Sequence, residues 1–389
     1  MSFLDIPQST QLILRPGIIE LSWGQPDPAL LPVEQVSRAT VAMLAQMGGD
    51  ALSYGASAGA GSLIAWIRKR IQRLEGQPLS NNEIVISAGN SDAVDQICTL
   101  FTRPGDVVLV ESPTYHLALR IIHDHGLNIV PVPLDEHGLQ VNQLAARVRE
   151  LKAQGQTVRM LYTIPTYHNP TGICLSNDRR HALIELAIAE DFLIIEDDVY
   201  RELGYDGPPP PSLWSLAPRG RALRLGSFAK TLAPGLRLGW INGSLEQIDI
   251  IANCGLRDSG GGLNHFAAMT IGQLGESGDF DGLLEKFRTA YRQRRDTLVA
   301  ALIEYLPAGC TWVKPAGGFF VWVTLPNRVD AATLLAQAEA VGVAYIPGGR
   351  FHYDGRGANT LRLAFCLYPP EELAKGAERL GRAIRAWVD

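Results

Sequence analysis

The sequence lacks several features that define particular classes of protein. Its five cysteines are scattered and form no C-x-x-C pair, which argues against a disulfide framework and predicts reduced thiols in the cytoplasm. No apolar run approaches the ~18 residues of a membrane span, so no membrane association is expected. The first residues, MSFLDIPQST, show no basic segment followed by an apolar one, so no signal peptide is expected. The eight histidines show no H-x-x-H or H-x-x-x-H spacing, so no metal site is expected.

The sequence also lacks a large excess of either charge. Lys and Arg together number 35 and Asp and Glu 40, which gives a net charge of −5. A protein that binds nucleic acid usually has a basic surface, so no nucleic-acid partner is expected. Hydrophobic residues make up 46% of the 389 residues, as in an ordinary globular protein, and the length predicts two or three domains.

Short apolar runs alternate with helical patterns through the middle of the chain. The runs are apolar at successive positions, which is typical of parallel strands buried on both faces. Helical stretches such as 141–154 and 179–191 lie between several of them. This alternation predicts an α/β fold with a doubly wound, mostly parallel sheet and right-handed crossovers. The expected strands cover residues 83–88, 106–111, 127–132, 158–164, 192–197 and 222–228.

The pattern changes near residue 280, where a long amphipathic helix is expected at 281–306. A smaller α+β domain is predicted to follow, with strands at 317–325, 343–348 and 359–365 and a last helix at 371–387. The proline-containing N-terminal segment is expected to lie against this domain or the cleft. We therefore expect a large domain at 45–280 and a small domain formed by 1–44 and 281–389.

The segment SFAKTLAPGLRLG (227–239) carries the clearest pattern of chemically active residues. It places Lys230 directly after an expected strand and Arg237 seven residues later, beyond a Pro-Gly turn. Ligands of open α/β sheets bind beyond the carboxyl ends of the strands, so both residues follow the edge where a ligand would bind. A single lysine in such a loop is more often a surface residue, so its meaning depends on its neighbours.

Four further strand ends carry polar residues. Each one alone fits an ordinary turn, helix cap or packing residue. Because the carboxyl ends of parallel strands meet at one edge, together they predict a site with an amine, a carboxylate, phenols, an amide and an anion-binding loop. The segments are IIEDDVY (194–200) with Asp197 and Tyr200, YHNPTG (167–172) with Asn169, ISAGNSDAVDQI (86–97) with Asn90 and Ser91, and ESPTYH (111–116) with Tyr115.

Taken together, the motifs resemble those of the class I/II aminotransferases, which are fold type I enzymes that use pyridoxal 5′-phosphate (PLP). S-x-x-K with a following R-x-G, N-P-T-G, D-x-x-Y and the G-G-F-F-x-W strand occur in the family's order, from about Trp23 to Phe365. The spacing of seven between Lys230 and Arg237 differs from the eight of aspartate aminotransferases. It resembles the 2-aminoadipate/kynurenine aminotransferase branch, which the early segments LSWGQPDPALLP and ALSYGASAGAGSL also fit.

The resemblance implies roles for the residues that bind the cofactor. Lys230 would form the Schiff base with PLP and then move a proton between Cα and C4′. Asp197 would keep the pyridine nitrogen protonated, so that the ring accepts electrons from Cα. Tyr200, the third catalytic residue, would hydrogen-bond O3′ of the ring. The other implied cofactor ligands are Asn169 at O3′, Tyr115 on the ring face, and Asn90, Ser91, Ser227 and Arg237 at the phosphate.

The resemblance also implies how the two substrates, an amino acid and a 2-oxo acid, are bound. Arg362 would bind the α-carboxylate through its planar guanidinium, with Asn169 nearby. Gly24 would pass close to the substrate, where a side chain would clash. Tyr54 resembles the tyrosine that reaches the phosphate of the neighbouring subunit, which implies a homodimer.

Two alternative functions remain on sequence alone. A different PLP-dependent reaction at Cα or Cβ, such as that of a lyase, cyclase or decarboxylase, would use the same cofactor residues. A PLP-sensing regulator is not favoured, since only about 22 residues precede the first matching motif and regulators carry a DNA-binding domain there.

Some residues near the motifs have open roles. Arg15 and Arg350 are candidates, by position only, for binding a second carboxylate of the substrate. The segment 257–266, with three glycines, suggests a mobile loop near the dimer cleft. Three histidines near the motifs are taken as polar residues at the rim of the cleft: His116, His168 and His265.

Overall fold

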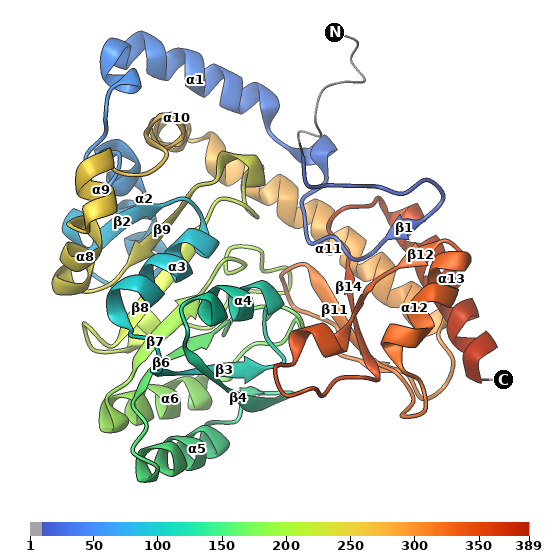
Figure 1. Cartoon of the computed structure of the whole chain (residues 1–389). Helices are drawn as coiled ribbons and strands as arrows, with labels where there is room; N and C mark the ends of the chain where they lie inside the picture. Colours follow the sequence, from blue (N-terminus) through green and yellow to red (C-terminus); the bar gives the residue numbers. More distant parts are fainter. Residues whose placement is uncertain (1–9, 389) are drawn as a thin grey trace, which may run out of the picture.

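The computed structural model describes residues 10–388, which form two connected parts, each built around a sheet (Figure 1). Residues 1–9 and 389 lie outside the described part, and with them nearly all of the segment for which no signal peptide was expected. Between residues 10 and 388, no helix is long and apolar enough to cross a bilayer, and no three potential metal ligands are grouped.

The larger part contains an eight-stranded mixed sheet with the order β2-β9-β8-β7-β6-β3-β4-β5. All six expected strands are present in it and run in one direction, and only β9 and the short β5 run against their neighbours. The strands are β2 (Ile84–Ser87), β3 (Val107–Ser112), β4 (Asn128–Asp135), β5 (Gly138–Leu139), β6 (Val158–Thr163), β7 (Leu193–Asp197), β8 (Ala222–Ser227) and β9 (Gly239–Asn242).

Helices cover both faces of this sheet, which confirms the doubly wound α/β prediction. The apolar positions of β2 and β3 alternate between two buried clusters. Val85, Val108 and Val110 face α3, α4 and α8, while Ile84 and Leu109 belong to the cluster that contains α2, α5 and α6. Buried apolar residues on both faces explain the unbroken apolar runs in the sequence. The helices of this part are α2 (Gly61–Glu75), α3 (Asn90–Phe101), α4 (His116–Asp124), α5 (Val141–Ala153), α6 (Asn177–Glu190), α7 (Leu213–Leu216), α8 (Leu245–Ala252), α9 (Gly255–Gly260) and α10 (His265–Glu276).

The smaller part contains a four-stranded antiparallel sheet and a separate two-stranded one. The first has the order β10-β11-β14-β13, and in the second β1 runs parallel to β12, which joins the N-terminal segment to this part as expected. Its elements are β1 (Ile19–Glu20), β10 (Thr311–Trp312), β11 (Phe320–Thr324), β12 (Val343–Ala344), β13 (Ile346–Pro347), β14 (Thr360–Ala364), α12 (Ala331–Ala340) and α13 (Pro370–Val388).

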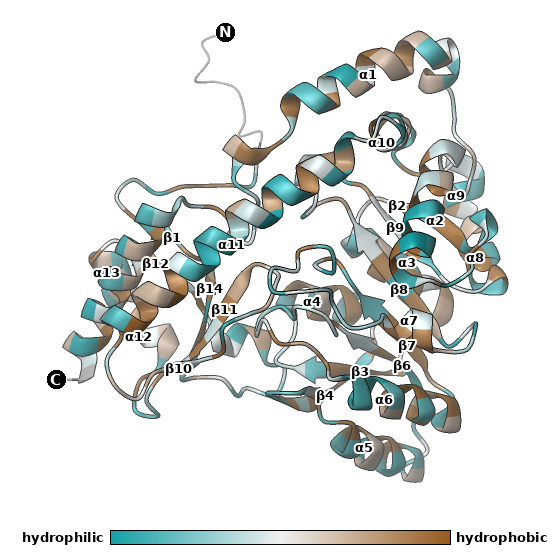
Figure 2. Cartoon of the chain, turned by 180° about the vertical axis from the view of Figure 1, so that it is seen from behind, coloured by the Kyte–Doolittle hydropathy of each residue, from teal (hydrophilic) through white to brown (hydrophobic). Residues whose placement is uncertain are grey.

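A single long helix, α11 (Asp279–Tyr305), connects the two parts. It contacts α10 near one end and packs against α13 over its C-terminal portion, and Figure 2 shows it crossing the back of the molecule. The N-terminal helix α1 (Val33–Met47) lies against α10 rather than against the small sheet (Figure 1). The described part of the segment 1–44 therefore touches both parts, and the proposed domain boundaries stay a prediction.

Two local expectations were wrong. The predicted strand at 343–348 is two strands in different sheets, because the buried Tyr345 between them points its hydroxyl to the carbonyl of Ala331 in α12. The predicted loop at 257–266 is shorter than expected, because residues 257–260 belong to α9 and 265–266 to α10, and only 261–264 connect them. Arg257 anchors α9, since its buried guanidinium donates to Gln96 of α3 at 2.9 Å.

Candidate active site

Lys230 lies in the turn that follows β8, at the carboxyl edge of the large sheet. The hydroxyl of Ser227 accepts a hydrogen bond from the backbone N–H of Ala229 at 3.1 Å, which shapes this turn. The Lys230 amine donates to the carbonyl of Gly24 at 2.7 Å, so the N-terminal segment closes over it. Burial lowers the pKa of Lys230 to about 8, and the nearby Arg362 and Arg237 act in the same direction. A minor fraction of this amine is therefore neutral near physiological pH, but far more than of a solvated lysine.

Asp197 ends the neighbouring strand β7 and is buried. Its two carboxylate oxygens accept hydrogen bonds from different elements: the hydroxyl of Tyr162 in β6 at 2.7 Å and the amide of Asn90 in α3 at 2.5 Å. Burial raises the pKa of Asp197 above its ordinary value, while these two hydrogen bonds act in the opposite direction because they favour the charged form. The Asn90 side chain is thus directed at Asp197, and only its backbone N–H remains for the predicted phosphate.

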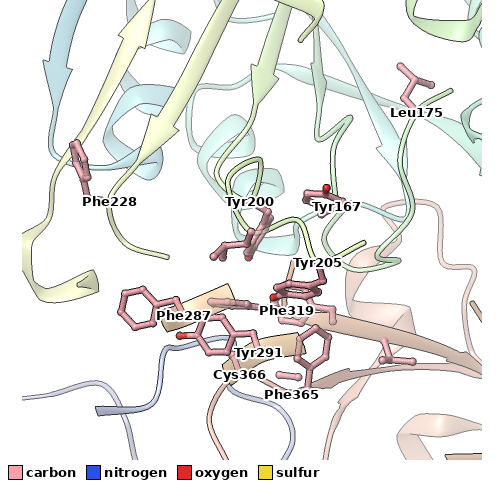
Figure 3. Close-up of a cluster of buried hydrophobic side chains, with 14 of the residues drawn as sticks. Tyr167, Leu175, Tyr200, Tyr205, Phe228, Phe287, Tyr291, Phe319, Phe365 and Cys366 are labelled. Atoms are coloured by element: carbon pink, nitrogen blue, oxygen red, sulfur yellow. The ribbon is translucent and has the colours of Figure 1, made fainter. Parts of the chain in front are cut away.

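Tyr200 stands between the two parts of the molecule. Its ring makes an edge contact with Phe319 of the smaller part at a centroid distance of 5.5 Å (Figure 3). A second edge contact, with Phe320, has a centroid distance of 5.8 Å. Burial raises its pKa well above the ordinary value, so the phenol stays protonated. Its hydroxyl forms no hydrogen bond with the described residues, which leaves it free to bind a ligand. Tyr115 precedes α4 and lies near Asp197 and Arg362, both of which influence its pKa, although burial is the main cause of its rise.

Arg362 projects from β14 of the smaller part into the same site. Its guanidinium donates to the side-chain oxygen of Asn169 at 3.0 Å and to the carbonyl of Ser22 at 2.8 Å, and it lies 4.0 Å from the centroid of the Phe320 ring. Burial lowers its pKa to about 10, so it remains a cation at neutral pH. A buried cation without a carboxylate partner is well placed to bind an anionic substrate group.

An anion-binding loop is formed where β2 leads into α3. Gly89 adopts a left-handed conformation (φ 95°), and a Cβ there would lie 3.0 Å from the Arg237 guanidinium. Arg237 donates to the carbonyl of Ala88 at 3.1 Å and so stands beside the N-terminus of a twelve-residue helix. The N–H groups at the helix N-terminus and the Arg237 charge are donors of the kind that a phosphate needs, and Ser91 lies in the first turn of this helix.

Gly24 and Tyr54 have environments that the sequence did not reveal. A Cβ at Gly24 would lie 2.7 Å from the Phe320 ring. This ring alone therefore requires a glycine at position 24, whether or not the substrate also passes close to it. Tyr54 is 89% exposed and lies beside Gly261, with no hydrogen bond or ion pair to any described residue. Within one chain it therefore forms no hydrogen bond or ion pair with the other candidate site residues.

The three histidines near the motifs have different surroundings. His168 is buried, 3.2 Å from a carboxylate oxygen of Glu111, so it does not lie at the rim. His265 contacts the carbonyl of Asp50 and follows Asn264, whose side chain donates to the carbonyl of Arg237. His116 is half-buried and lines a cavity beside Arg362, and its pKa is lowered to about 4, mainly by burial.

Two residues of the site were missed at the sequence level. Tyr162 was counted only as part of a buried strand, although a polar group next to a strand's carboxyl end was a usable sign. Cys366 was counted only as one of five scattered cysteines. It follows β14 near Lys230 and Arg362, and burial raises its pKa to about 12, so it stays a thiol.

The collected groups fit a flat, phosphorylated ring ligand that reacts with an amine. A lysine with a lowered pKa, a carboxylate, two phenols and a helix N-terminus beside an arginine lie at the carboxyl edge of the large sheet, and Nε of Arg362 and Oδ1 of Asn90 are buried without partners among the described residues. This combination at the carboxyl edge of a doubly wound sheet defines a PLP-dependent enzyme of fold type I.

Comparison with known proteins identifies the family. The family model for class I and II aminotransferases matches residues 16–380, and the chain belongs to that family. It is 36% identical to aromatic-amino-acid aminotransferase 1 of Thermococcus litoralis, over 99% of this chain and 92% of that protein. The crystal structure of a multiple substrate aminotransferase from Thermococcus profundus superimposes with a TM-score of 0.91 at 36% identity, covering 96% of this chain and 93% of that one.

A third relative connects the family to the cofactor. The crystal structure of an α-aminoadipate aminotransferase from Thermus thermophilus, complexed with N-(5′-phosphopyridoxyl)-L-leucine, has a TM-score of 0.86 at 30% identity, covering 96% of this chain and 93% of that one. The protein is thus a PLP-dependent aminotransferase, which moves the amino group of an L-amino acid to a 2-oxo acid by a ping-pong mechanism. The resemblance to the aminoadipate/kynurenine branch is confirmed.

Proposed function

We propose that Lys230, Asp197 and Tyr200 are the catalytic residues of this aminotransferase. The observation that carries the proposal is the half-buried Lys230 amine, which donates to the Gly24 carbonyl, has a lowered pKa and lies within electrostatic range of Asp197 and Arg362. PLP, when bound, accepts the amino group and draws electrons from Cα. The neutral Lys230 amine removes the proton from Cα of the substrate and returns one, while Asp197 keeps the ring nitrogen protonated.

The remaining residues hold the two ligands in place. Tyr115 covers the ring, Tyr200 and Asn169 donate to its oxygen, and Ser91, Ser227 and Arg237 bind the phosphate together with the N-terminus of α3. Arg362 binds the α-carboxylate of the substrate, and Gly24 holds the N-terminal segment over Lys230 through its carbonyl. Because Arg362 belongs to the smaller part and Lys230 to the larger one, movement of the two parts can open and close the site.

The active unit that we propose is a cytoplasmic homodimer in which Tyr54 reaches the neighbouring site. Three observations support it: Tyr54 is almost fully exposed, α1 and the segment after it also expose Val41 and Leu52 at 67% and 73%, and the described cysteines are all free. Exposed apolar residues that gather on one side of a chain are typical of an interface.

Mixed dimers of two inactive variants test this arrangement. Lys230→Ala and Tyr54→Ala chains are denatured together and refolded. If Tyr54 acts across the interface, one site of each mixed dimer contains an intact Lys230 and an intact Tyr54, so the mixture should be more active than the mean of the two parents. Activity equal to that mean would show that Tyr54 acts within its own chain or not at all.

The cavity beside Arg362 is proposed to receive the substrate side chain. It has a volume of about 820 Å³ and is lined by Trp23, His116 and Arg350, among others. Of the two sequence candidates for a second carboxylate, Arg15 already pairs with Glu20 and Glu339, whereas Arg350 has no ion pair with any described residue. The cavity thus combines an aromatic side chain with an unpaired cation. Two relatives are named for substrates that suit these groups, one for aromatic amino acids and one for 2-aminoadipate.

Replacing Arg350 with glutamine is expected to raise KM for 2-aminoadipate roughly threefold to tenfold and to leave KM for phenylalanine unchanged, because one exposed charge-assisted contact is lost. Steady-state kinetics with both donors measure the difference. The matched control is Arg356→Gln, since Arg356 lines the same cavity but is already paired with Asp354 at 2.6 Å. An equal change for both donors would remove Arg350 from side-chain recognition.

A further inference from the structure

The carboxylate of Asp197 is held from two sides by side chains of other elements. Tyr162 is fully buried and donates to Oδ2 from β6, while Asn90 donates to Oδ1 from the first turn of α3. The two donors are separated by 72 positions in the chain and meet only at this residue. Neither contact was expected from the sequence.

The chemistry of each contact fixes the direction of its hydrogen bond. Burial and the nearby Asp197 raise the pKa of Tyr162 well above its ordinary value, so its hydroxyl keeps its proton and donates. The Asn90 amide must point its nitrogen at the carboxylate, because its oxygen would be repelled. Its Oδ1 then lies buried without a partner among the described residues, so the contact with Asp197 is what orients this side chain.

We propose that Asn90 and Tyr162 form a two-sided clamp that positions the Asp197 carboxylate opposite the ring nitrogen of the cofactor and keeps it charged. This inference rests on the proposed role of Asp197. It makes Tyr162 a positioning residue, and it changes the predicted role of the Asn90 side chain from binding the phosphate to orienting Asp197.

The other groups around Asp197 do not replace the clamp. Asp198 raises its pKa by repulsion, and the backbone N–H of Val199 lowers it. Tyr115 and Lys230 lie within electrostatic range but form no hydrogen bond with it. Removal of either clamp donor therefore leaves a buried carboxylate with fewer donors, which favours its protonated form and weakens its interaction with a protonated ring nitrogen.

The test uses cofactor binding and its absorption spectrum. Asn90→Ala and Tyr162→Phe proteins are freed of cofactor, and PLP affinity is measured by equilibrium dialysis. Each substitution is expected to raise Kd for PLP about tenfold, since a hydrogen bond to a charged group is lost. In the PLP-loaded variants, the pH midpoint of the cofactor's absorption change should shift from that of the wild type. Tyr205→Phe, which loses a buried hydroxyl bonded to the carbonyl of Gly318, is the matched control and should change neither quantity.

Two probes separate the clamp from a phosphate contact. The affinity of the cofactor-free protein for inorganic phosphate should be the same in Asn90→Ala and the wild type. A PLP analogue with carbon in place of the ring nitrogen should bind the wild type and both variants equally. A fall in phosphate affinity with no spectral shift would assign the Asn90 side chain to the phosphate and overturn the proposal.

Two controls complete the test: the folding stability of the variants and PLP binding by the wild type. Thermal unfolding of the cofactor-free proteins shows whether Tyr162→Phe folds; if it does not, the half-buried Asn90, at the start of α3, carries the test alone. Unchanged Kd and an unchanged spectrum in folded variants would refute the clamp. Failure of the wild type to bind PLP would instead refute the proposed role of Asp197 and the site as a whole.

Discussion

Replacement of Lys230 by alanine is expected to abolish transamination, with kcat lower by on the order of 10⁴-fold or more. In the proposed mechanism the amine both attaches the cofactor and moves the Cα proton, and neither of the two nearby cations, Arg362 and Arg237, is an amine that could form a Schiff base. Oxo acid formation from an amino donor, followed by absorbance, measures the loss. Turnover at the wild-type rate would contradict the assignment.

A surface lysine provides the matched control for this substitution. Lys69 is exposed in α2 and forms only an ion pair of 3.5 Å with Glu276, so Lys69→Ala removes the same group without touching the site. Its kcat should equal that of the wild type. The same assay, run without an oxo acid acceptor, also tests the reaction type: one amino group per site should be transferred and then stop, whereas continuing release of ammonia or CO₂ would indicate a different PLP reaction.

The ionisation of Lys230 predicts a pH dependence in the cofactor-free protein. Burial lowers the pKa of the amine from 10.5 to about 8, so it is protonated below this pH and neutral above it. Since only the neutral amine reacts with an aldehyde, the rate of PLP uptake should rise with pH through a midpoint at about 8 and level off above it. A midpoint near the ordinary lysine pKa would show that the amine is solvated.

The same ionisation also affects folding stability. Between about pH 8 and 10.5 the unfolded chain binds a proton at Lys230 that the folded protein does not bind. The lysine's contribution to the free energy of unfolding therefore increases with pH across this interval, and it is least favourable below pH 8. Comparison of the wild type with Lys230→Ala by denaturant unfolding at several pH values isolates this contribution.

The sheet was largely predictable because burial on both faces leaves a direct mark on the sequence. Strands such as β3 and β8 are buried at every position, which gives the apolar runs from which they were predicted. β9 was missed because its four residues, GWIN, begin with glycine and follow directly on the Lys-Arg motif, so no run stands out. The two-residue strands β1, β5, β12 and β13 depend on pairing with distant segments, which local patterns do not show.

The site was predictable at the level of strand ends but not at the level of contacts. Asp197 ends a strand and Lys230 and Asn169 follow strands, and the carboxyl edge of a parallel sheet brings such residues together. The pairing of Asn90 with Asp197 depends on the angle between α3 and the sheet, which no spacing records. The requirement for Gly24 likewise comes from the ring of Phe320, which lies 296 positions away in β11. Contacts between residues so far apart in the chain leave no local pattern in the sequence.

Arg362 is expected to have the second largest effect. Its guanidinium is buried, bound to Asn169 and the Ser22 carbonyl, and its Nε has no partner among the described residues, so an incoming α-carboxylate completes its hydrogen bonding. Replacement by leucine should lower kcat/KM for amino acids about 100-fold, since the loss of one partner of a buried charge pair costs about 2–5 kcal/mol. Arg362→Lys keeps the charge but loses the planar guanidinium, so its kcat/KM should lie between those of the wild type and Arg362→Leu.

A substrate without the carboxylate separates recognition from damage to the site. An amine that lacks the α-carboxylate but has the same side chain should react slowly with the wild type and equally slowly with Arg362→Leu, because the contact that the variant loses is absent from this substrate. The coupling between the two changes then measures the Arg362–carboxylate interaction. If the variant were equally impaired with both substrates, the loss would come from the orphaned Asn169 amide and the displaced N-terminal segment, and Arg362 would be a structural residue rather than the carboxylate site.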